Sequence, residues 1–319
     1  MISATVVADS KHPQTGKRLI SIECVFNRYI LAEVNTHCML TKNSASSRAI
    51  PIQANIENII RNTGKPVSWG KNQSGMVADL DVDENTARLA EESWIRARDN
   101  AIKEALYLSE LGIHKQIANR LIENFTYQKA LISGTEWDNL LWLRAEKSAQ
   151  PEFQDLAFKI LDAINESNPT TLQIGEWHLP YINKYRDNYD VLHYLDVGGN
   201  DLSIENARKI SASCAAQISY RKNDDSLEKA LRVFDMLNLT DESGETRKHS
   251  SPVGHIGTPI DYSKGIICSN LSGGWNWDDG VTHIDKNGNL WSANFQDFIQ
   301  YRHLIPNESC KKHPDIIEK

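Results

Sequence analysis

Residues 36–48 read THCMLTKNSASSR, and they hold one histidine, three serines, two threonines, one asparagine and a final arginine. Short hydroxyl side chains and free backbone N–H groups can surround the oxygens of a phosphate, and a guanidinium adds a bidentate fork. The stretch therefore suits a phosphate-binding loop. An ordinary polar loop that ends in an exposed arginine has the same composition, so the residues alone leave both interpretations open.

The composition of the 319-residue chain excludes several classes of protein. Its 35 Lys and Arg against 42 Asp and Glu give a net charge of -7, which argues against a general nucleic-acid coat. The five cysteines have no CxxC spacing and predict neither a disulfide framework nor a zinc site. No apolar run approaches the roughly 20 residues of a membrane span, and the N-terminus lacks the apolar region of a signal peptide. We expect a cytoplasmic protein with no metal, no membrane partner and no nucleic-acid partner.

Periodicity predicts strands first and helices later in the chain. Residues 29–39 fit either a buried strand or a helix, and residues 249–291 are irregular. There is no internal repeat, heptad pattern or linker, so we expect one interwoven domain. The expected strands are residues 4–9 and 18–26, and the expected helices are residues 84–111, 115–125, 135–144, 151–164, 204–220 and 226–237.

A second polar cluster lies in residues 134–154, which read GTEWDNLLWLRAEKSAQPEFQ. On a helix, Trp137, Leu140 and Arg144 share a face, so the arginine follows apolar residues by one turn. Such an arginine lines a pocket or makes a surface ion pair, and the spacing fits both.

A third cluster, HSSPVGH at residues 249–255, places His249 and His255 six residues apart. The pair fits acid–base residues, metal ligands or structural histidines, with no carboxylate or thiolate nearby to favour a metal. The motifs HExxH, GxSxG and GxGxxG and the Walker loop do not occur.

Together these clusters resemble the flavin-dependent thymidylate synthases, the ThyX family, whose signature is RHRxxSxNxxSxR. The signature residues matched here are His37, Thr41 (in place of Ser), Asn43, Ser46 and Arg48. Leu143-Arg144 with residues 149–152 resembles the family's LRxxxxAQxE, and residues 118–121 resemble its ARxxL. Residues 249–255 resemble its HxSPxEH, and residues 216–220 resemble its ARVSY.

In most of the family, ARVSY and HxSPxEH precede the signature, but here they follow it. The chain therefore resembles circularly permuted members associated with phages, in which pieces similar to residues 69–76 and 292–306 occupy these places. The resemblance implies an α+β fold, an antiparallel sheet with flanking helices. It implies one domain over residues 1–319, with a helical middle at about 84–166 and a permuted segment at about 200–305.

The family's activity is the reductive methylation of dUMP to dTMP. The resemblance implies that reduced FAD carries a one-carbon unit from methylenetetrahydrofolate to the uracil ring and then supplies a hydride, with NADPH as reductant. It also implies a homotetramer in which several chains build each active site. No cysteine nucleophile is needed.

Matching positions imply roles for ten residues. Arg144 and Ser46 would be catalytic, with Arg144 facing the pyrimidine and stabilising charge as its 5-carbon becomes nucleophilic. The residues implied for dUMP are Ser46, Ser47, Arg48, Arg120 and Arg144, and those implied for the flavin are His37, Asn43, Asn139, Ser219 and His255.

Five positions depart from the family pattern. Thr36, Cys38 and Thr135 stand where the family has arginines, and Ser44 and Gly254 stand where it has acidic residues. The candidate replacement cations are Lys42, Lys71 and Arg302. Cys38 is either a small polar substitution or a nucleophile.

These changes leave two other functions open. One is hydroxymethylation of dUMP, or methylation or hydroxymethylation of dCMP, to make modified DNA bases on the same scaffold. The other is a catalytically silent nucleotide-binding or assembly subunit.

Overall fold

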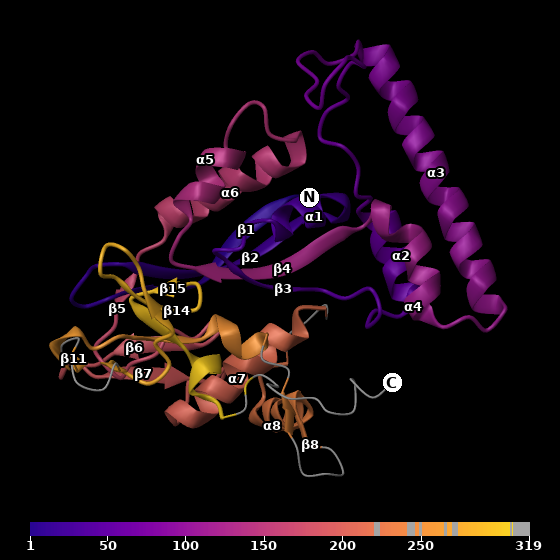
Figure 1. Cartoon of the computed structure of the whole chain (residues 1–319). Helices are drawn as coiled ribbons and strands as arrows, with labels where there is room; N and C mark the ends of the chain where they lie inside the picture. The colour runs from indigo at the N-terminus through magenta and orange to yellow at the C-terminus, as the bar shows by residue number, and fades with distance from the viewer. Residues whose placement is uncertain are drawn as a thin grey trace, which may run out of the picture.

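A five-stranded sheet forms the centre of the computed structural model, which describes residues 1–219, 224–240, 246–248, 251–264, 267–269, 274–306 and 308 (Figure 1). The strand order is β3-β4-β2-β1-β5. All neighbours pair antiparallel except β1 and β5, which run parallel. The strands are β1 Ser3–Lys11, β2 Arg18–Asn27, β3 Thr41–Ser44, β4 Tyr127–Gly134 and β5 Thr170–Thr171.

Alternation along β2 and β4 gives the sheet two different faces. On one face Ile20, Ile22 and Phe26 are fully or almost fully buried in the largest apolar cluster. On the other face Ser21 lies directly opposite Ser133 of β4. The sheet therefore buries an apolar side and a side that carries hydroxyl groups.

Helices cover both faces (Figure 1). The apolar face packs against α6, Pro151–Glu166, whose Phe153, Leu156 and Ile160 are buried, and α5, Asp138–Arg144, lies beside it. The hydroxyl-bearing face meets α7, Ile204–Ala216, and the 3-10 helix η3, Gln217–Ser219, through Leu131 of β4. Helix α8, Leu227–Leu237, packs on α7.

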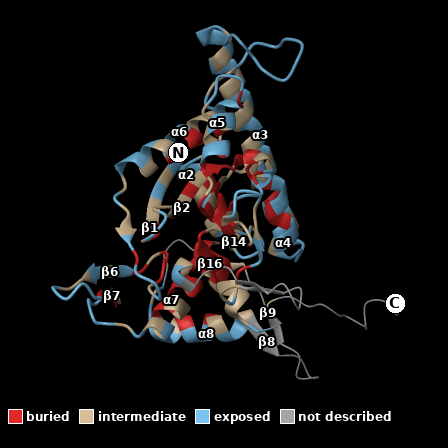
Figure 2. Cartoon of the chain, turned by 60° about the vertical axis from the view of Figure 1, so that its left-hand side comes forward, coloured by how far each residue is buried: buried red, intermediate tan, exposed pale blue. Residues whose placement is uncertain are grey.

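The longest helix, α3 (Glu84–Glu110), stands away from the sheet (Figure 1). Asp83 caps it by accepting a hydrogen bond from the Thr86 backbone N–H at 3.0 Å. Only Ile102 and Ala105 of this helix are buried, against α2 Ile52–Arg61 and η2 Asn119–Phe125. In Figure 2 the buried residues gather in the middle of the molecule, and the far end of α3 is largely exposed.

Short elements complete the fold. The short helices are η1 Arg28–Ile30, α1 Leu31–Asn35, α4 Lys115–Ala118, η4 Pro252–His255, η5 Tyr262–Lys264 and η6 Tyr301–Leu304. The remaining strands are β6 Asn183–Arg186, β7 Leu192–Leu195, β8 Asn238–Thr240, β9 Thr246–Lys248, β10 Gly257–Pro259, β11 Ile267–Ser269, β12 Gly274–Asn276, β13 His283–Ile284, β14 Leu290–Ser292, β15 Phe295–Gln296 and β16 Phe298–Gln300.

The α+β character predicted from the sequence is confirmed, and several boundaries differ. The helix expected over residues 135–144 begins only at Asp138, because β4 continues to Gly134 and the Trp137 Nε1 donates back to the Gly134 carbonyl at 2.9 Å. The helix expected over residues 115–125 is α-helical for one turn and then 3-10. Residues 29–39 form no strand: two short helices end at Asn35, and residues 36–39 form turns. Within the described ranges, no helix combines the length and apolarity that a membrane crossing requires.

Candidate functional site

Two residues predicted for the site contact each other beside the apolar face of the sheet. The Arg144 Nε donates to the His37 Nε2 at 3.1 Å, and its guanidinium carbon lies 4.7 Å from the centre of the Phe153 ring. Burial, followed by the positive charges of Arg144 and Lys42, lowers the pKa of His37 to about 4. His37 is therefore neutral at pH 7, and it can accept the hydrogen bond that orients the arginine.

The strand β3 is tied to the segment after α7 by two hydrogen bonds. The Asn43 Nδ2 donates to the Ala215 carbonyl at 2.6 Å, and the Ser46 backbone N–H donates to the Ser219 Oγ at 2.9 Å. Residues more than 170 positions apart are thus brought together. Asn43, Ser46 and Ser219 form one neighbourhood.

A carboxylate holds two of the residues predicted to bind the nucleotide. The Glu123 Oε1 accepts from the Ser47 hydroxyl and from the Arg120 Nη1, the latter at 2.8 Å. Arg48 and Asn139 are exposed, and neither side chain makes a hydrogen bond or an ion pair within the described part of the chain. Arg120 and Ser47 are therefore together, whereas the side chains of Arg48 and Asn139 bond to no other predicted site residue that the structure describes.

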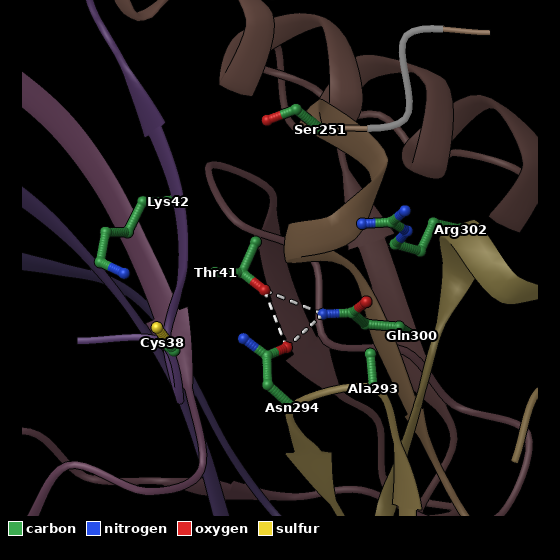
Figure 3. A pocket seen from close by; sticks show the side chains of 8 residues that line it. All are labelled: Cys38, Thr41, Lys42, Ser251, Ala293, Asn294, Gln300 and Arg302. Carbon is green, nitrogen blue, oxygen red and sulfur yellow. Dashed lines mark hydrogen bonds between the residues drawn. The ribbon is translucent and has the colours of Figure 1, made fainter. Parts of the chain in front are cut away.

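A polar cavity of about 440 Å³ opens next to β3 (Figure 3). It is lined by Cys38, Thr41, Lys42, Ser251, Ala293, Asn294, Gln300 and Arg302. Burial lowers the pKa of the Lys42 ammonium, which donates to the His37 carbonyl and, at 3.0 Å, to the Leu40 carbonyl. Arg302 pairs with Glu308, 3.0 Å away. Two of the three candidate replacement cations thus line this cavity, and Lys71 does not.

One wall of the cavity carries two amides and a hydroxyl in mutual contact. The Thr41 Oγ1 donates to the Asn294 Oδ1 at 3.0 Å, and the Gln300 Nε2 donates to both of these oxygens at 2.9 Å. Figure 3 shows the triangle of bonds. Gln300 is 1% exposed, yet its Oε1 has no hydrogen-bond partner among the described residues. A buried acceptor without a partner costs about 1–3 kcal/mol, so such an atom calls for an explanation.

A buried hydroxyl chain of five residues crosses the other face of the sheet. The Ser10 Oγ bonds the His178 Nδ1 at 2.9 Å, and the His178 Nε2 bonds the Ser21 Oγ at 2.8 Å. The Ser21 Oγ bonds the Ser133 Oγ at 2.5 Å, and the Ser133 Oγ bonds the His255 Nδ1 at 2.8 Å. All five side chains are completely buried. The His255 Nε2 has no partner in the described part of the chain.

Burial keeps both histidines of this chain neutral. It lowers the pKa of His255 to about 3 and holds the pKa of His178 well below its ordinary value. Ser133 also lies directly opposite Thr41 across the β3–β4 pair. The row of hydroxyls from Ser21 therefore ends at the wall of the cavity.

Other residues singled out in the sequence are buried or lie outside the described part of the chain. His255 is fully buried, so only its Nε2 is free to meet a ligand, and its role towards a flavin stays a prediction. His249 and Tyr220 lie outside the described residues. Thr135, in the place of a family arginine, is buried, and its Oγ1 accepts from the Gln296 backbone N–H at 3.0 Å. Among the residues that the structure describes, no group of three or more His, Cys, Asp or Glu could hold a metal ion.

No pattern in the sequence predicted the buried hydroxyl chain or the amide wall. The available signal for the chain was a serine inside each of three apolar strands, at positions 10, 21 and 133. Asn294 and Gln300 gave no signal beyond their place in residues 292–306. The arrangement as a whole offers cations and hydroxyls for an anion, and an amide wall for a polar ring.

No family model matches the chain, and no curated protein does. The solved structures that are similar to it include a UMP/dUMP methylase, PolB from Streptomyces cacaoi, bound with 5-Br dUMP. That match has 13% identity and a TM-score of 0.43, and it covers 52% of this chain and 90% of the other. The flavin-dependent thymidylate synthase ThyX from Helicobacter pylori, complexed with FAD and dUMP, matches at 19% identity and a TM-score of 0.34. It covers 46% of this chain and 67% of the other. Both are distant likenesses.

Proposed function

We propose that this chain transfers a one-carbon unit from methylenetetrahydrofolate to C5 of dUMP, giving dTMP, with FAD as bound cofactor and NADPH as reductant. The observation that supports this most directly is the contact between Arg144 and His37, which come from two separate segments of the motif resemblance. Only the Nε of Arg144 is used there, and neither Nη group has a hydrogen-bond partner among the residues that the structure describes, so both are available to a substrate.

In this proposal Arg144 acts on the pyrimidine. As C5 becomes nucleophilic, negative charge develops on the ring, and a guanidinium already fixed by His37 and Phe153 stabilises that charge without reorganisation. The neutral state of His37 matters here, because a protonated ring could not accept the Arg144 hydrogen bond.

Ser46, Ser47, Arg48 and Arg120 are proposed to hold the phosphate and sugar of the nucleotide. Arg48 is already free of protein partners in the described part of the chain, and Arg120 is half exposed despite its contact with Glu123. A phosphate is a bidentate partner for such a guanidinium. Arg48 therefore supplies the main anchoring charge, and Arg120 adds to it.

The cavity residues fit a group that carries both phosphates and a polar ring. Lys42 and Arg302 bring positive charge, and the side chains of Asn294 and Gln300 line the same cavity. FAD, when bound, supplies the hydride and carries the one-carbon unit. His37, Asn43, Asn139 and Ser219 are proposed to face it, and His255 to approach it through Nε2.

We propose a circularly permuted homotetramer as the working form. Arg48 and Asn139 are exposed, and their side chains make no hydrogen bond or ion pair with the other predicted site residues in the described part of the chain. Neighbouring subunits would complete sites that a single chain leaves dispersed.

Flavin absorption and tritium release test this proposal. Purified protein is expected to show flavin absorption bands that change when dUMP is added. With methylenetetrahydrofolate, NADPH and FAD, it should release tritium from 5-tritiated dUMP, because the C5 hydrogen leaves as the new bond forms. A colourless protein that binds no added FAD would contradict the proposal.

A second function is favoured by Cys38, which lines the cavity where the family has an arginine. The loss of that charge alters the pocket in a way that can admit water or a different pyrimidine. Mass spectrometry of the products from dUMP and dCMP separates the two functions. Hydroxymethylated dUMP, or any modified dCMP, would favour the second function, and dTMP as the sole product would exclude it.

A further inference from the structure

Three donor side chains converge on one carboxylate oxygen beside the loop that follows β3. The Glu123 Oε1 accepts a hydrogen bond from the Ser47 hydroxyl and, at 2.8 Å, another from the Arg120 Nη1. The Arg28 Nη2 lies 3.6 Å from the same oxygen. Arg28 belongs to η1, Arg120 to η2 and Ser47 to the loop. Three separate segments of the chain therefore surround one negatively charged oxygen.

The charges around this oxygen do not balance. Arg28 and Arg120 bring two positive charges, and Glu123 brings one negative charge. Among the residues that the structure describes, neither arginine forms an ion pair with a second carboxylate. A phosphate monoester has three acceptor oxygens and a charge of about −1.5 to −2 at pH 7. Such a group matches two guanidinium ions better than a single carboxylate does.

Other hydrogen bonds hold the groups that surround the carboxylate. The fully buried Asn119 donates from its Nδ2 to the Ser47 carbonyl at 2.8 Å, which fixes the backbone of the loop. The Oε1 of the buried Gln128 accepts from the Arg28 Nη1, which fixes that guanidinium. Neither bond involves Glu123. The loop and Arg28 therefore keep these anchors when the carboxylate moves away.

We propose that Glu123 is an internal substitute for a phosphate, and that a nucleotide binds by displacing this carboxylate from Arg28 and Arg120. The carboxylate can leave, because its side chain is 18% exposed and its Oε2 accepts no hydrogen bond from the described residues. The affinity for a nucleotide is then reduced by the fraction of molecules in which Glu123 keeps its place. The inference rests on the proposed function for the position of the phosphate, and it adds Arg28 to the residues that hold it.

Neutralising the carboxylate tests this inference by the sign of the effect. Glu123→Gln keeps the shape of the side chain and removes its charge, so it should strengthen the binding of dUMP about fivefold or more. Calorimetric titration of the full chain measures this change. If Glu123 instead orients Arg120 and Ser47 for the nucleotide, the same variant would bind dUMP more weakly. Deoxyuridine, which has no phosphate, should bind both forms equally, whereas dCMP, if it binds, should respond as dUMP does.

Further variants assign the effect to this group of residues. Arg28→Gln should weaken the binding of dUMP about tenfold and leave that of deoxyuridine unchanged, because a phosphate contact is lost. Glu123→Ala should change affinity in the same direction as Glu123→Gln, and thermal melting shows that each variant is folded. Glu166→Gln changes the net charge equally at an exposed carboxylate of α6 that has no ion pair in the described part of the chain. It is the matched control and should bind dUMP as the unaltered chain does.

The inference and the proposed function can fail separately. Unchanged or weaker binding of dUMP in Glu123→Gln, an equal gain for deoxyuridine, or no binding of dUMP and dCMP by any form would overturn the inference. A gain that depends on the phosphate, without one-carbon transfer, would uphold the inference and remove the proposed function. One-carbon transfer to dUMP without a gain in affinity from Glu123→Gln would do the reverse.

Discussion

The buried hydroxyl chain and the three predicted site arginines differ in how far protein atoms satisfy their polar groups. In the chain of Ser10, His178, Ser21, Ser133 and His255, protein atoms satisfy every group but one, and no side chain reaches solvent. Arg48, Arg120 and Arg144 keep guanidinium N–H groups free of protein partners within the described residues. Polar groups that bond each other stabilise the fold, whereas polar groups kept free are available to a ligand. The two regions should therefore respond differently to substitution.

The largest expected effect is on catalysis, at Arg144. Arg144→Ala should lower kcat for tritium release from dUMP by about 10²–10³-fold, or roughly 3–4 kcal/mol, because the developing ring charge loses a positioned donor. The free energy of unfolding of the Arg144→Ala variant should fall by less than about 1 kcal/mol, since the side chain of Arg144 is only half-buried. Arg88→Ala, at an exposed pair on α3, is the control. Unchanged turnover in Arg144→Ala would show that the reaction does not use the free N–H groups of this arginine.

The next effect is on stability, at Ser21. Ser21→Val should lower the free energy of unfolding by about 2–4 kcal/mol, because His178 and Ser133 each lose a buried partner. Urea denaturation measures this change. Turnover per folded molecule should stay close to that of the unaltered chain. A clear fall in turnover per folded molecule would instead show that the buried hydroxyl chain takes part in the reaction.

A pH effect follows from the lowered pKa values of His37, His178 and His255. The unfolded chain binds protons near the ordinary histidine pKa of about 6.5, whereas the folded chain resists them until about pH 4 at His37 and about pH 3 at His255. The stability that these neutral histidines contribute is therefore fully present above pH 6.5, and it is lost progressively as the pH falls below that value. Each histidine contributes a slope of up to about 1.4 kcal/mol per pH unit. Urea midpoints at pH 7, 6 and 5 should give a shallower slope in His255→Asn, and an unchanged slope would contradict its buried neutral state.

The smallest effect on stability is expected at Arg48. Arg48→Ala should change the free energy of unfolding by less than about 0.5 kcal/mol, because the side chain is exposed and unpaired in the described part of the chain. It should weaken dUMP binding about tenfold through the lost phosphate contact, as measured by calorimetry. Deoxyuridine, which has no phosphate, serves as the control ligand and should bind both forms equally. Equal weakening of both ligands would show that Arg48 supports the loop rather than the phosphate.

The sequence was informative where a local pattern determines structure. The helices at residues 84–111 and 151–164 follow from apolar periodicity, the Asp83 cap and a proline in the first turn, and both are present with small shifts of their ends. The polar residues 41–44 showed no period because β3 is a short edge strand, held by pairing with β4 rather than by its own apolar pattern.

The site could be predicted only in part for a similar reason. Local motifs pointed to His37 and Arg144, but their contact depends on how α5 packs beside the sheet. The amide wall requires that residue 41 meet residues 294 and 300, a long-range pairing that no local pattern encodes.

The unpartnered Nε2 of His255 acquires a further property from the chain of hydrogen bonds behind it. Each serine has one hydroxyl proton, and each neutral histidine has one ring proton, so the donors along the chain must all run in the same direction. In one direction Nε2 carries a proton and donates, and in the other it has a lone pair and accepts. His255 cannot change its tautomer alone, because Ser133, Ser21, His178 and Ser10 must reverse with it. A polar atom that arrives at Nε2 would therefore set the proton positions as far away as β1.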